Sequence, residues 1–206
     1  MIVYVCLMIE SKAERTTNYI LETVAPYFNK HGYTATSMSD ITKATGLTKG
    51  AVYGNFESKE DLSLKAFDYN IKRVIQEMRS YTQKAKTPLD KLYALTAFYR
   101  IYHDYTSNLG GCPILNVGVD ANNNNGLLHQ RVKQVITELQ DKMIYLIEKG
   151  IEAGQLKPDL NPKIYARRIF ALMEGSIFMS ITMESGSYIK DMMNFIDQMI
   201  ATEMAL

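Results

Sequence analysis

Hydrophobic residues recur every three or four positions along most of the chain, which is the spacing of one face of an α-helix. No segment alternates convincingly between apolar and polar residues, as a half-buried strand would. Turn-forming residues separate the periodic segments. The sequence therefore predicts an all-α protein of about nine helices. The expected helices cover residues 11–30, 37–45, 49–55, 59–84, 88–107, 127–152, 162–183 and 188–204, with one or two further turns in 112–119.

The first expected helix, from Ser11 to Lys30, carries Ile20 and Val24 on its apolar side. Pro26 lies inside this pattern. Because proline lacks a backbone N–H and its ring crowds the preceding turn, we expect it to kink or split the helix.

Residues 33–62 contain the signals of two short helices joined by a tight turn. Gly46 is expected to end the first helix in a left-handed conformation. Thr48 is a good N-cap for the second helix. This arrangement predicts a helix–turn–helix, which places its second helix in the major groove of DNA.

The second short helix has two distinct sides in this interpretation. Val52 and Phe56 lie one turn apart and can face the core, whereas Lys49 and Tyr53 lie one turn apart on another side and can project outward. Ser58 then begins a further helix with Asp61 at the third position, a variant of the capping box.

The string TSMSDITKATGLTKGAVYGNFESKEDL resembles the DNA-binding domain of the TetR (tetracycline-repressor-like) family of bacterial transcription regulators. The resemblance runs from about residue 13 to about residue 67, and beyond it concerns length and helical layout. It implies an N-terminal three-helix helix-turn-helix domain, residues 1–57. A continuous helix would join it to a C-terminal helical domain, residues 58–206, for ligand binding and dimerisation.

The resemblance also implies which residues contact double-stranded DNA. Helix N-termini offer free N–H groups to phosphate, a lysine can contact phosphate or a guanine edge, and a glycine lets the backbone approach closely. The alternative for each residue taken singly is a solvated polar group. The candidates are Thr36, Ser37, Thr48, Lys49, Gly50, Tyr53, Asn55 and Lys59.

Composition adds little support for nucleic-acid binding, because 23 basic and 22 acidic residues leave a formal charge of +1. The 2 cysteines form no CxxC pair, which argues against a disulfide framework or a structural zinc site and fits a reducing cytoplasm. The apolar start, residues 1–9, is too short to span a bilayer. We expect it to be a tail, or an extension upstream of a chain that starts at Met8, and we expect no membrane association.

The last two expected helices, 162–183 and 188–204, are apolar around most of their circumference. One apolar stripe would serve the core of a single chain, so the second stripe predicts a partner surface. The alternative is a helix buried on all sides within one chain. The TetR resemblance implies a homodimer through these two helices, which would bind a palindromic operator.

The second domain is rich in aromatic residues and methionine, which can line a pocket between helices. The alternative is an ordinary hydrophobic core. The TetR resemblance implies a small-molecule effector whose binding alters DNA affinity, and it gives no cofactor. The candidate effector residues are Tyr99, Tyr102, His103, Asn116, Phe170 and Met173.

Cys112, in GGCPIL, resembles a motif of some oxidant- and electrophile-sensing members of the TetR family. A thiol near a helix N-terminus can have a lowered pKa and become reactive. The alternative is a small buried side chain at a tight junction.

Catalysis is not expected. His103 and Asp104 are adjacent on a helix and point about 100° apart, a poor arrangement for a catalytic dyad. The strings GxSxG, HExxH and GxGxxG are absent. We therefore expect a repressor released by a small-molecule effector. The alternative is a DNA-binding dimer controlled by a protein partner or by oxidation of Cys112.

Overall fold

The computed structural model describes residues 11–206, and the N-terminal tail predicted from the sequence lies outside this range. The regular elements of the described range are helices, together with one isolated β-bridge between Leu156 and Ala205. The prediction of an all-α protein is confirmed. The helices are α1 (Lys12–His31), α2 (Met38–Thr45), α3 (Lys49–Tyr53), α4 (Lys59–Thr82), α5 (Pro88–Arg100), α6 (Tyr102–Ser107), α7 (Pro113–Ala121), α8 (Gly126–Glu152), α9 (Pro162–Thr182), α10 (Ser187–Met199) and the π-helical turn η1 (Ile200–Met204).

Most helices begin and end where their terminal residues predict. The hydroxyls of Thr48 and Ser58 accept hydrogen bonds from the N–H groups of Ala51 and Asp61, and so cap α3 and α4. Gly46 ends α2 in the left-handed conformation, with φ of 69°. These local signals fix where the chain turns in the region around α2 and α3.

Two predicted helices differ from the structure. The helix expected over residues 88–107 is two helices, α5 and α6, which meet at Ile101. The helix expected over 188–204 ends as an α-helix at Met199 and continues as η1. Neither change is marked by glycine or proline, so the sequence carries no local signal for it.

Of the two outcomes expected at Pro26, a kink or a split, the split does not occur, because α1 is one helix of 20 residues with Pro26 inside it. Val24, Ala25 and Phe28 are buried around the proline. The side-chain amide of Asn70 on α4 donates a hydrogen bond of 3.0 Å to the Ala25 carbonyl. The carbonyl that loses its helical donor at Pro26 is that of Glu22, so this bond does not replace the donor; the buried packing of α1 against α4 stabilises the helix across the proline.

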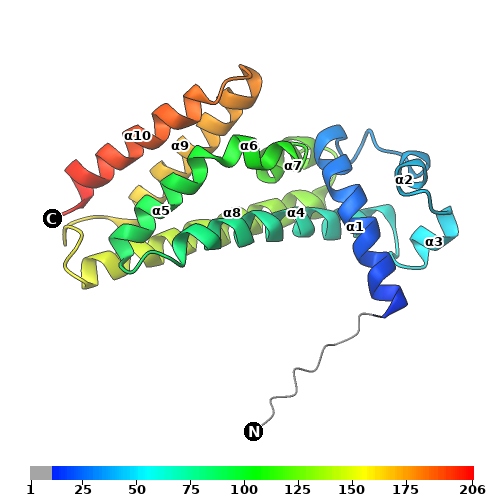
Figure 1. The fold of residues 1–206 in the computed structure, drawn as a ribbon, viewed down its shortest axis with the longest axis horizontal. Coiled ribbons are helices and arrows are strands. Elements are labelled where there is room, and N and C mark those ends of the chain that lie inside the picture. The colour runs from blue at the N-terminus through cyan, green and yellow to red at the C-terminus, as the bar shows by residue number, and fades with distance from the viewer. Residues whose placement is uncertain (1–10) are drawn as a thin grey trace, which may run out of the picture.

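Residues 11–206 form two hydrophobic cores, and α4 contributes to both of them. Leu62 and Ala66 pack in the first core with α1, α2 and α3, whereas Phe67 and Ile71 pack in the second core with the remaining helices. In Figure 1 the first three helices lie at one end of the elongated molecule, and α9 and α10 lie along the opposite part. A continuous helix, with no flexible linker, thus joins the two parts.

A second connection between the two parts is formed by polar groups of α1, of α7 and of the segment before α7. The amide nitrogen of Asn29 donates to the carbonyls of Leu109 (2.6 Å) and Gly111 (2.8 Å). The amide nitrogen of Asn116 donates to the carbonyls of Asn29 and Gly110, each at 3.0 Å. We call these groups the junction. They fix α1 to the larger domain independently of α4.

Gly110 is required at the junction by both its conformation and its surroundings. Its φ is 78°, and a Cβ there would lie 2.7 Å from the Pro26 carbonyl oxygen. Gly110→Ala is therefore expected to reduce the free energy of unfolding by about 1–3 kcal/mol. Urea denaturation measures this change. Gly126→Ala is the matched control, because its added methyl group meets nothing within 4 Å. Equal stabilities of the two variants would contradict this account of the junction.

Candidate functional site

The first candidate site is the outer surface of α3. Val52 is 1% exposed and Phe56 is 2% exposed, so the inner side of this short helix belongs to the small core, as the sequence predicts. Lys49 and Gly50 are exposed, and 40% of Tyr53 is accessible. The Nζ atom of Lys49 lies 5.7 Å from the centre of the Tyr53 ring. The outer side of α3 therefore presents a cation, an open backbone and an aromatic ring together.

The surface of α3 continues onto α2. A shallow, nearly flat concavity spans the two helices, and polar residues of α2 that were not predicted from the sequence border it. Ser39 and Lys43 lie one turn apart on α2, opposite the buried Ile41, and this spacing was a signal that could have identified them. The concavity is lined by Ser39, Thr42, Lys43, Gly46, Leu47, Thr48 and Lys49.

Two of the hydroxyls predicted to bind DNA, those of Thr48 and Ser37, cap helices at this surface. They differ in whether the hydroxyl proton is still available for a hydrogen bond to DNA. The Thr48 hydroxyl accepts a hydrogen bond from the Ala51 N–H (3.1 Å), which leaves its own proton available. The Ser37 hydroxyl donates its proton to the Asp40 carboxylate at 2.6 Å. Hydrogen bonds from Ser37 lower the pKa of Asp40, and the resulting carboxylate lies beside Ser37. Thr48 is therefore better suited than Ser37 to donate to a phosphate.

Thr36 and Asn55, also predicted to contact DNA, form hydrogen bonds within the small domain. Thr36 is 2% exposed, and its hydroxyl donates to the Gly32 carbonyl at 2.7 Å. The side chain of Asn55 accepts a hydrogen bond from the Thr17 hydroxyl (2.9 Å) and donates to the Ala51 carbonyl (2.8 Å). Burial argues against a surface role for Thr36, whereas Asn55 is half-buried and its contact with DNA stays a prediction.

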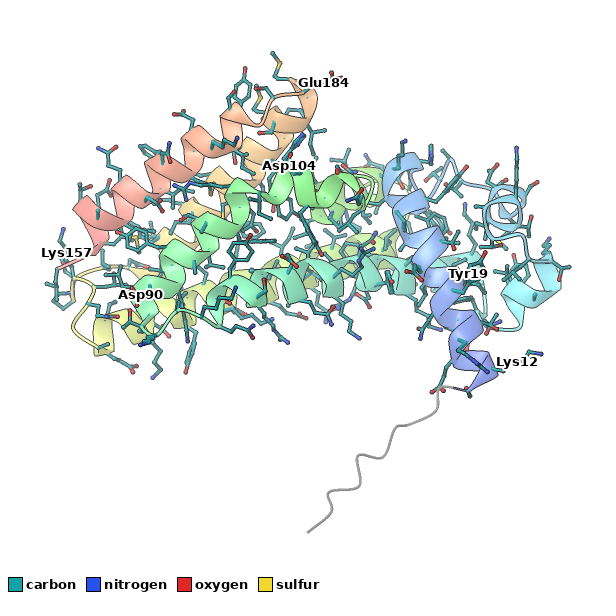
Figure 2. The ribbon with its side chains drawn as sticks, in the orientation of Figure 1. Lys12, Tyr19, Asp90, Asp104, Lys157 and Glu184 are labelled. Atoms are coloured by element: carbon teal, nitrogen blue, oxygen red, sulfur yellow. The ribbon has the colours of Figure 1, made fainter. Side chains whose placement is uncertain are left out.

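Two further side chains position this surface. In Figure 2, Tyr19 projects from α1, and its hydroxyl donates a hydrogen bond of 2.8 Å to the Thr45 carbonyl at the end of α2. The Nζ atom of Lys59, predicted to clamp a phosphate, lies 4.3 Å from the centre of the Tyr33 ring. Burial lowers the pKa of Lys59, although the carboxylates of Asp120 and Asp40 oppose that shift. Lys59 is thus held against the protein at the start of α4.

The second candidate site is a cavity of about 240 Å³ in the larger domain. Its lining is mostly apolar and comes from four helices, α4, α5, α8 and α9. An apolar cavity of about 150 Å³ is large enough to hold benzene, so this one can hold a small organic molecule. The lining residues are Met78, Thr82, Lys91, Leu95, Tyr99, Leu139, Lys142, Met143, Tyr145, Leu146 and Phe170.

The cavity includes two of the six residues predicted to bind an effector, Tyr99 and Phe170. Tyr102 and Met173 are buried in the core and do not line it. His103 is also absent from the lining, and Asn116 belongs to the junction. The interpretation of these four residues as part of one pocket with Tyr99 and Phe170 is therefore corrected. The sequence did not predict that Lys91 and Lys142 line the cavity.

Cys112 lies in a buried cluster with Tyr102 and Glu174. The Tyr102 hydroxyl donates to the Cys112 Sγ atom at 3.2 Å, and the thiol points to the Glu174 Oε2 atom at 3.9 Å. Burial and the nearby Glu174 carboxyl raise the pKa of the Cys112 thiol. A protonated, buried thiol is a weak nucleophile. These observations favour a packing role for Cys112 over the predicted redox role.

An exposed apolar surface covers the outer sides of α9 and α10. Phe178 and Phe195 each have an exposed fraction of 51%, and Met183 has one of 53%. The inner side of each helix is buried in the large core. Two apolar sides per helix agree with the pattern seen in the sequence. The outer surface comprises Ile164, Phe178, Met179, Met183, Tyr188 and Phe195.

Comparison with known proteins assigns both parts of the chain to a protein family. Residues 20–66 match the family described as bacterial regulatory proteins, tetR family, and residues 88–196 match the tetracyclin repressor-like C-terminal domain. The chain belongs to the TetR family. It is a TetR-family transcriptional regulator, and the members of this family are not enzymes.

Solved structures of TetR-family proteins resemble most of the chain. A TetR transcriptional regulator from Chloroflexus aurantiacus is 32% identical with a TM-score of 0.90, over 95% of this chain and 98% of that one. A TetR-family regulator from Cytophaga hutchinsonii is 34% identical with a TM-score of 0.85, over 93% and 96%. The regulator AcrR of Shigella flexneri is 31% identical over 86 residues, which are 42% of this chain and 39% of AcrR.

None of the helices in residues 11–206 of this TetR-family regulator combines the length and the hydrophobicity needed to cross a bilayer. Within the same residues, no group of three or more metal-ligating side chains is close enough together to hold an ion.

Glu174 gives this TetR-family regulator a testable pH dependence. Burial raises the pKa of the Glu174 carboxyl to about 7, against an ordinary value of 4.5. Between these two values the folded state keeps a proton that the unfolded state has lost, so stability falls as the pH rises and the loss is complete above about pH 7. Glu174→Gln should remove this slope and stabilise the protein at pH 8 by up to about 3 kcal/mol.

Urea denaturation at pH 5, 6, 7 and 8 measures the effect, as the difference between the wild type and Glu174→Gln. Glu148→Gln, at an exposed position on α8, is the matched control and should follow the wild type. If Glu174→Gln also follows the wild type at every pH, the buried carboxyl is not protonated in the fold.

Proposed function

We propose that this TetR-family regulator is a homodimeric transcriptional repressor that binds a palindromic operator and releases it when a small molecule enters the cavity. The observation that carries the proposal is the outer side of α3, where Lys49, Gly50 and Tyr53 are exposed beside the N-terminal cap Thr48. A short helix exposed in this way can enter the major groove with its first residues against base edges. DNA as the target also favours a cytoplasmic location.

Binding would combine three contacts on each copy. The free Thr48 proton and the first N–H groups of α3 would bind phosphate. Lys49 would contact a phosphate or a guanine edge, and Tyr53 would reach a phosphate or lie on a thymine methyl group. Lys43 on α2, which borders the same concavity, would add a further cationic contact. Ser37, the N-cap of α2, remains part of the proposed DNA-binding surface. Its contact would be made by the N-terminus of α2.

The exposed apolar surface of α9 and α10 supports a symmetric dimer. Burying large side chains such as Phe178 and Phe195 removes apolar area from water, which stabilises association. An isologous interface of this kind relates the two copies by a two-fold axis. The two α3 helices would then read a site with the same symmetry.

Release of DNA would follow from the shared helix α4. Met78 and Thr82 of α4 line the cavity, and Leu62 and Ala66 of the same helix pack in the DNA-binding core. A ligand that binds better to one position of α4 would shift the population towards that position and change the spacing of the two α3 helices. The presence of a cavity favours control by a ligand over control by a protein partner alone.

Selection of random duplexes on the purified protein tests the proposed DNA binding. We expect a site with two-fold symmetry and an affinity that falls steeply with salt concentration. Repeating the selection with genomic fragments would then identify the target. Recovery of unrelated sequences with no common site would contradict the proposed function.

Lys49→Ala is expected to weaken binding to the selected duplex at least 10-fold, because it removes a cation from each α3 helix. If Lys49 binds phosphate, the slope of log affinity against log salt also falls by about 0.9 for each phosphate that is no longer neutralised. Fluorescence anisotropy at several salt concentrations measures both quantities. Lys86→Ala is the matched control, since this exposed lysine lies close in sequence to Asp90 at the opposite end of the molecule (Figure 2). Wild-type affinity of Lys49→Ala would exclude the proposed docking.

Phe178→Glu combined with Phe195→Glu is expected to convert the dimer into a monomer, because four carboxylates would face one another across the interface. Sedimentation velocity measures the mass, and circular dichroism checks that the helices remain. Val119→Glu, at a residue that is 76% exposed on α7, should stay dimeric. A wild-type protein that sediments as a monomer at all concentrations would remove the basis of the two-fold arrangement.

A further inference from the structure

Asp120, near the end of α7, joins the larger domain to the turn between α1 and α2. The Tyr33 N–H donates a hydrogen bond of 2.7 Å to the Asp120 Oδ2 atom. The other carboxylate oxygen lies beside Gly32, since a Cβ at Gly32 would be 3.1 Å from Asp120 Oδ1. A hydrogen bond to a carboxylate is stronger than one between neutral groups. The carboxylate thus lies directly against the first two residues that follow α1.

The turn that Asp120 contacts leads directly into the helix–turn–helix. The buried Thr36 hydroxyl donates to the Gly32 carbonyl at 2.7 Å and so closes the turn on itself. Ser37 then caps α2. No free segment remains between the turn and α2, so the position of the turn fixes where α2 begins.

Asp120 also acts on the start of α4, which follows α3 in the chain. Burial lowers the pKa of Lys59, and the Asp120 carboxylate opposes that shift, so the two side chains attract each other. The Nζ atom of Lys59 in turn lies 4.3 Å from the centre of the Tyr33 ring. One carboxylate of the larger domain therefore influences both the entry to the helix–turn–helix and its exit.

The helix that carries Asp120 belongs to the larger domain. Ile114 and Val117 of α7 are buried in the large core, and among the described residues the small core takes none from this helix. Asn116, one turn before Asp120, bonds to the Asn29 carbonyl at the junction. The junction thus holds α1, whereas Asp120 holds the turn beyond it. This added contact reduces the freedom of the small domain to rotate against the larger one.

We propose that Asp120 is a positioning residue that fixes the angle of the helix–turn–helix to the larger domain, and so sets the half-site spacing that the dimer accepts. This inference rests on the proposed function, because a spacing exists only for a dimer on DNA. The two α3 helices must match two half-sites in both distance and rotation. A small domain free to rotate would fit several spacings, but it would lose affinity because binding must order it. A small domain held by Asp120 fits one spacing best.

Duplexes that carry the selected half-sites at different separations test the inference. One added base pair turns a half-site by about 35° and moves it by about 3.4 Å. We expect the wild type to lose at least about 10-fold in affinity when one base pair is inserted or removed. Asp120→Ala should lose no more than about 3-fold, and should bind the best duplex about 3- to 10-fold more weakly than the wild type. The preferred bases within each half-site should not change, because α3 keeps its own side chains.

Two further variants assign the effect to the hydrogen bond. Asp120→Asn keeps an oxygen that can accept from the Tyr33 N–H, so it should retain most of the wild-type spacing preference. Asp104→Ala removes an exposed carboxylate from α6 (Figure 2) and is the matched control, with an unchanged spacing preference expected. If Asp120→Asn behaved as Asp120→Ala does, the assignment to the Tyr33 bond would be overturned.

Hydrogen exchange of the backbone amides, measured by NMR without DNA, checks the contact itself. The Tyr33 amide should exchange at least about 10-fold faster in Asp120→Ala than in the wild type, while amides within α4 stay protected and show that the variant is folded. Unchanged exchange at Tyr33, or a wild-type spacing preference in Asp120→Ala, would overturn the inference and leave the proposed function standing. Failure of the wild type to select any site would contradict the proposed function and remove the inference with it.

Discussion

The arrangement of this protein depends on α4, a single helix that is buried in two hydrophobic cores. Leu62 and Ala66 belong to the core of the small domain, and the next residue, Phe67, belongs to the core of the large one. An α-helix with its hydrogen bonds intact transmits displacement better than a flexible linker does. In the proposed mechanism, a shift of α4 against α5 or α8 would therefore reach the small domain, because the helix offers no intervening joint.

The junction limits the directions in which the small domain can respond. Asn29 and Asn116 tie α1 to α7 and to the segment before it, so the domain is attached at two separate places. With two attachments, the small domain can rotate about the line that joins them more readily than it can tilt in other directions. Two buried amide oxygens near this point, those of Asn29 and Asn70, have no partner among the described residues, and a space of about 20 Å³ lies beside them. That volume suits one water molecule, which would complete the polar contacts.

Local chemistry explains how much of the fold could be predicted from the sequence. Caps such as Thr48 and Gly46 fix helix ends through their immediate neighbours, and a sequence displays these neighbours directly. The break at Ile101 has no such signal. Burial of Thr36 and the contacts of Asn55 depend on other helices, so their residue types alone suggested surface positions. The cavity was predicted least well, because periodicity identifies the apolar side of each helix but not which sides of four helices meet.

The two sides of α3 have separate requirements, and this separation has an evolutionary consequence. Five residues are too few for a stable isolated helix, so α3 depends on the burial of Val52 and on its caps. Lys49, Gly50 and Tyr53 contribute little to that burial. Substitutions at these outer positions can change which bases are preferred while the domain still folds. Related chains can thus acquire new target genes without first acquiring a new scaffold.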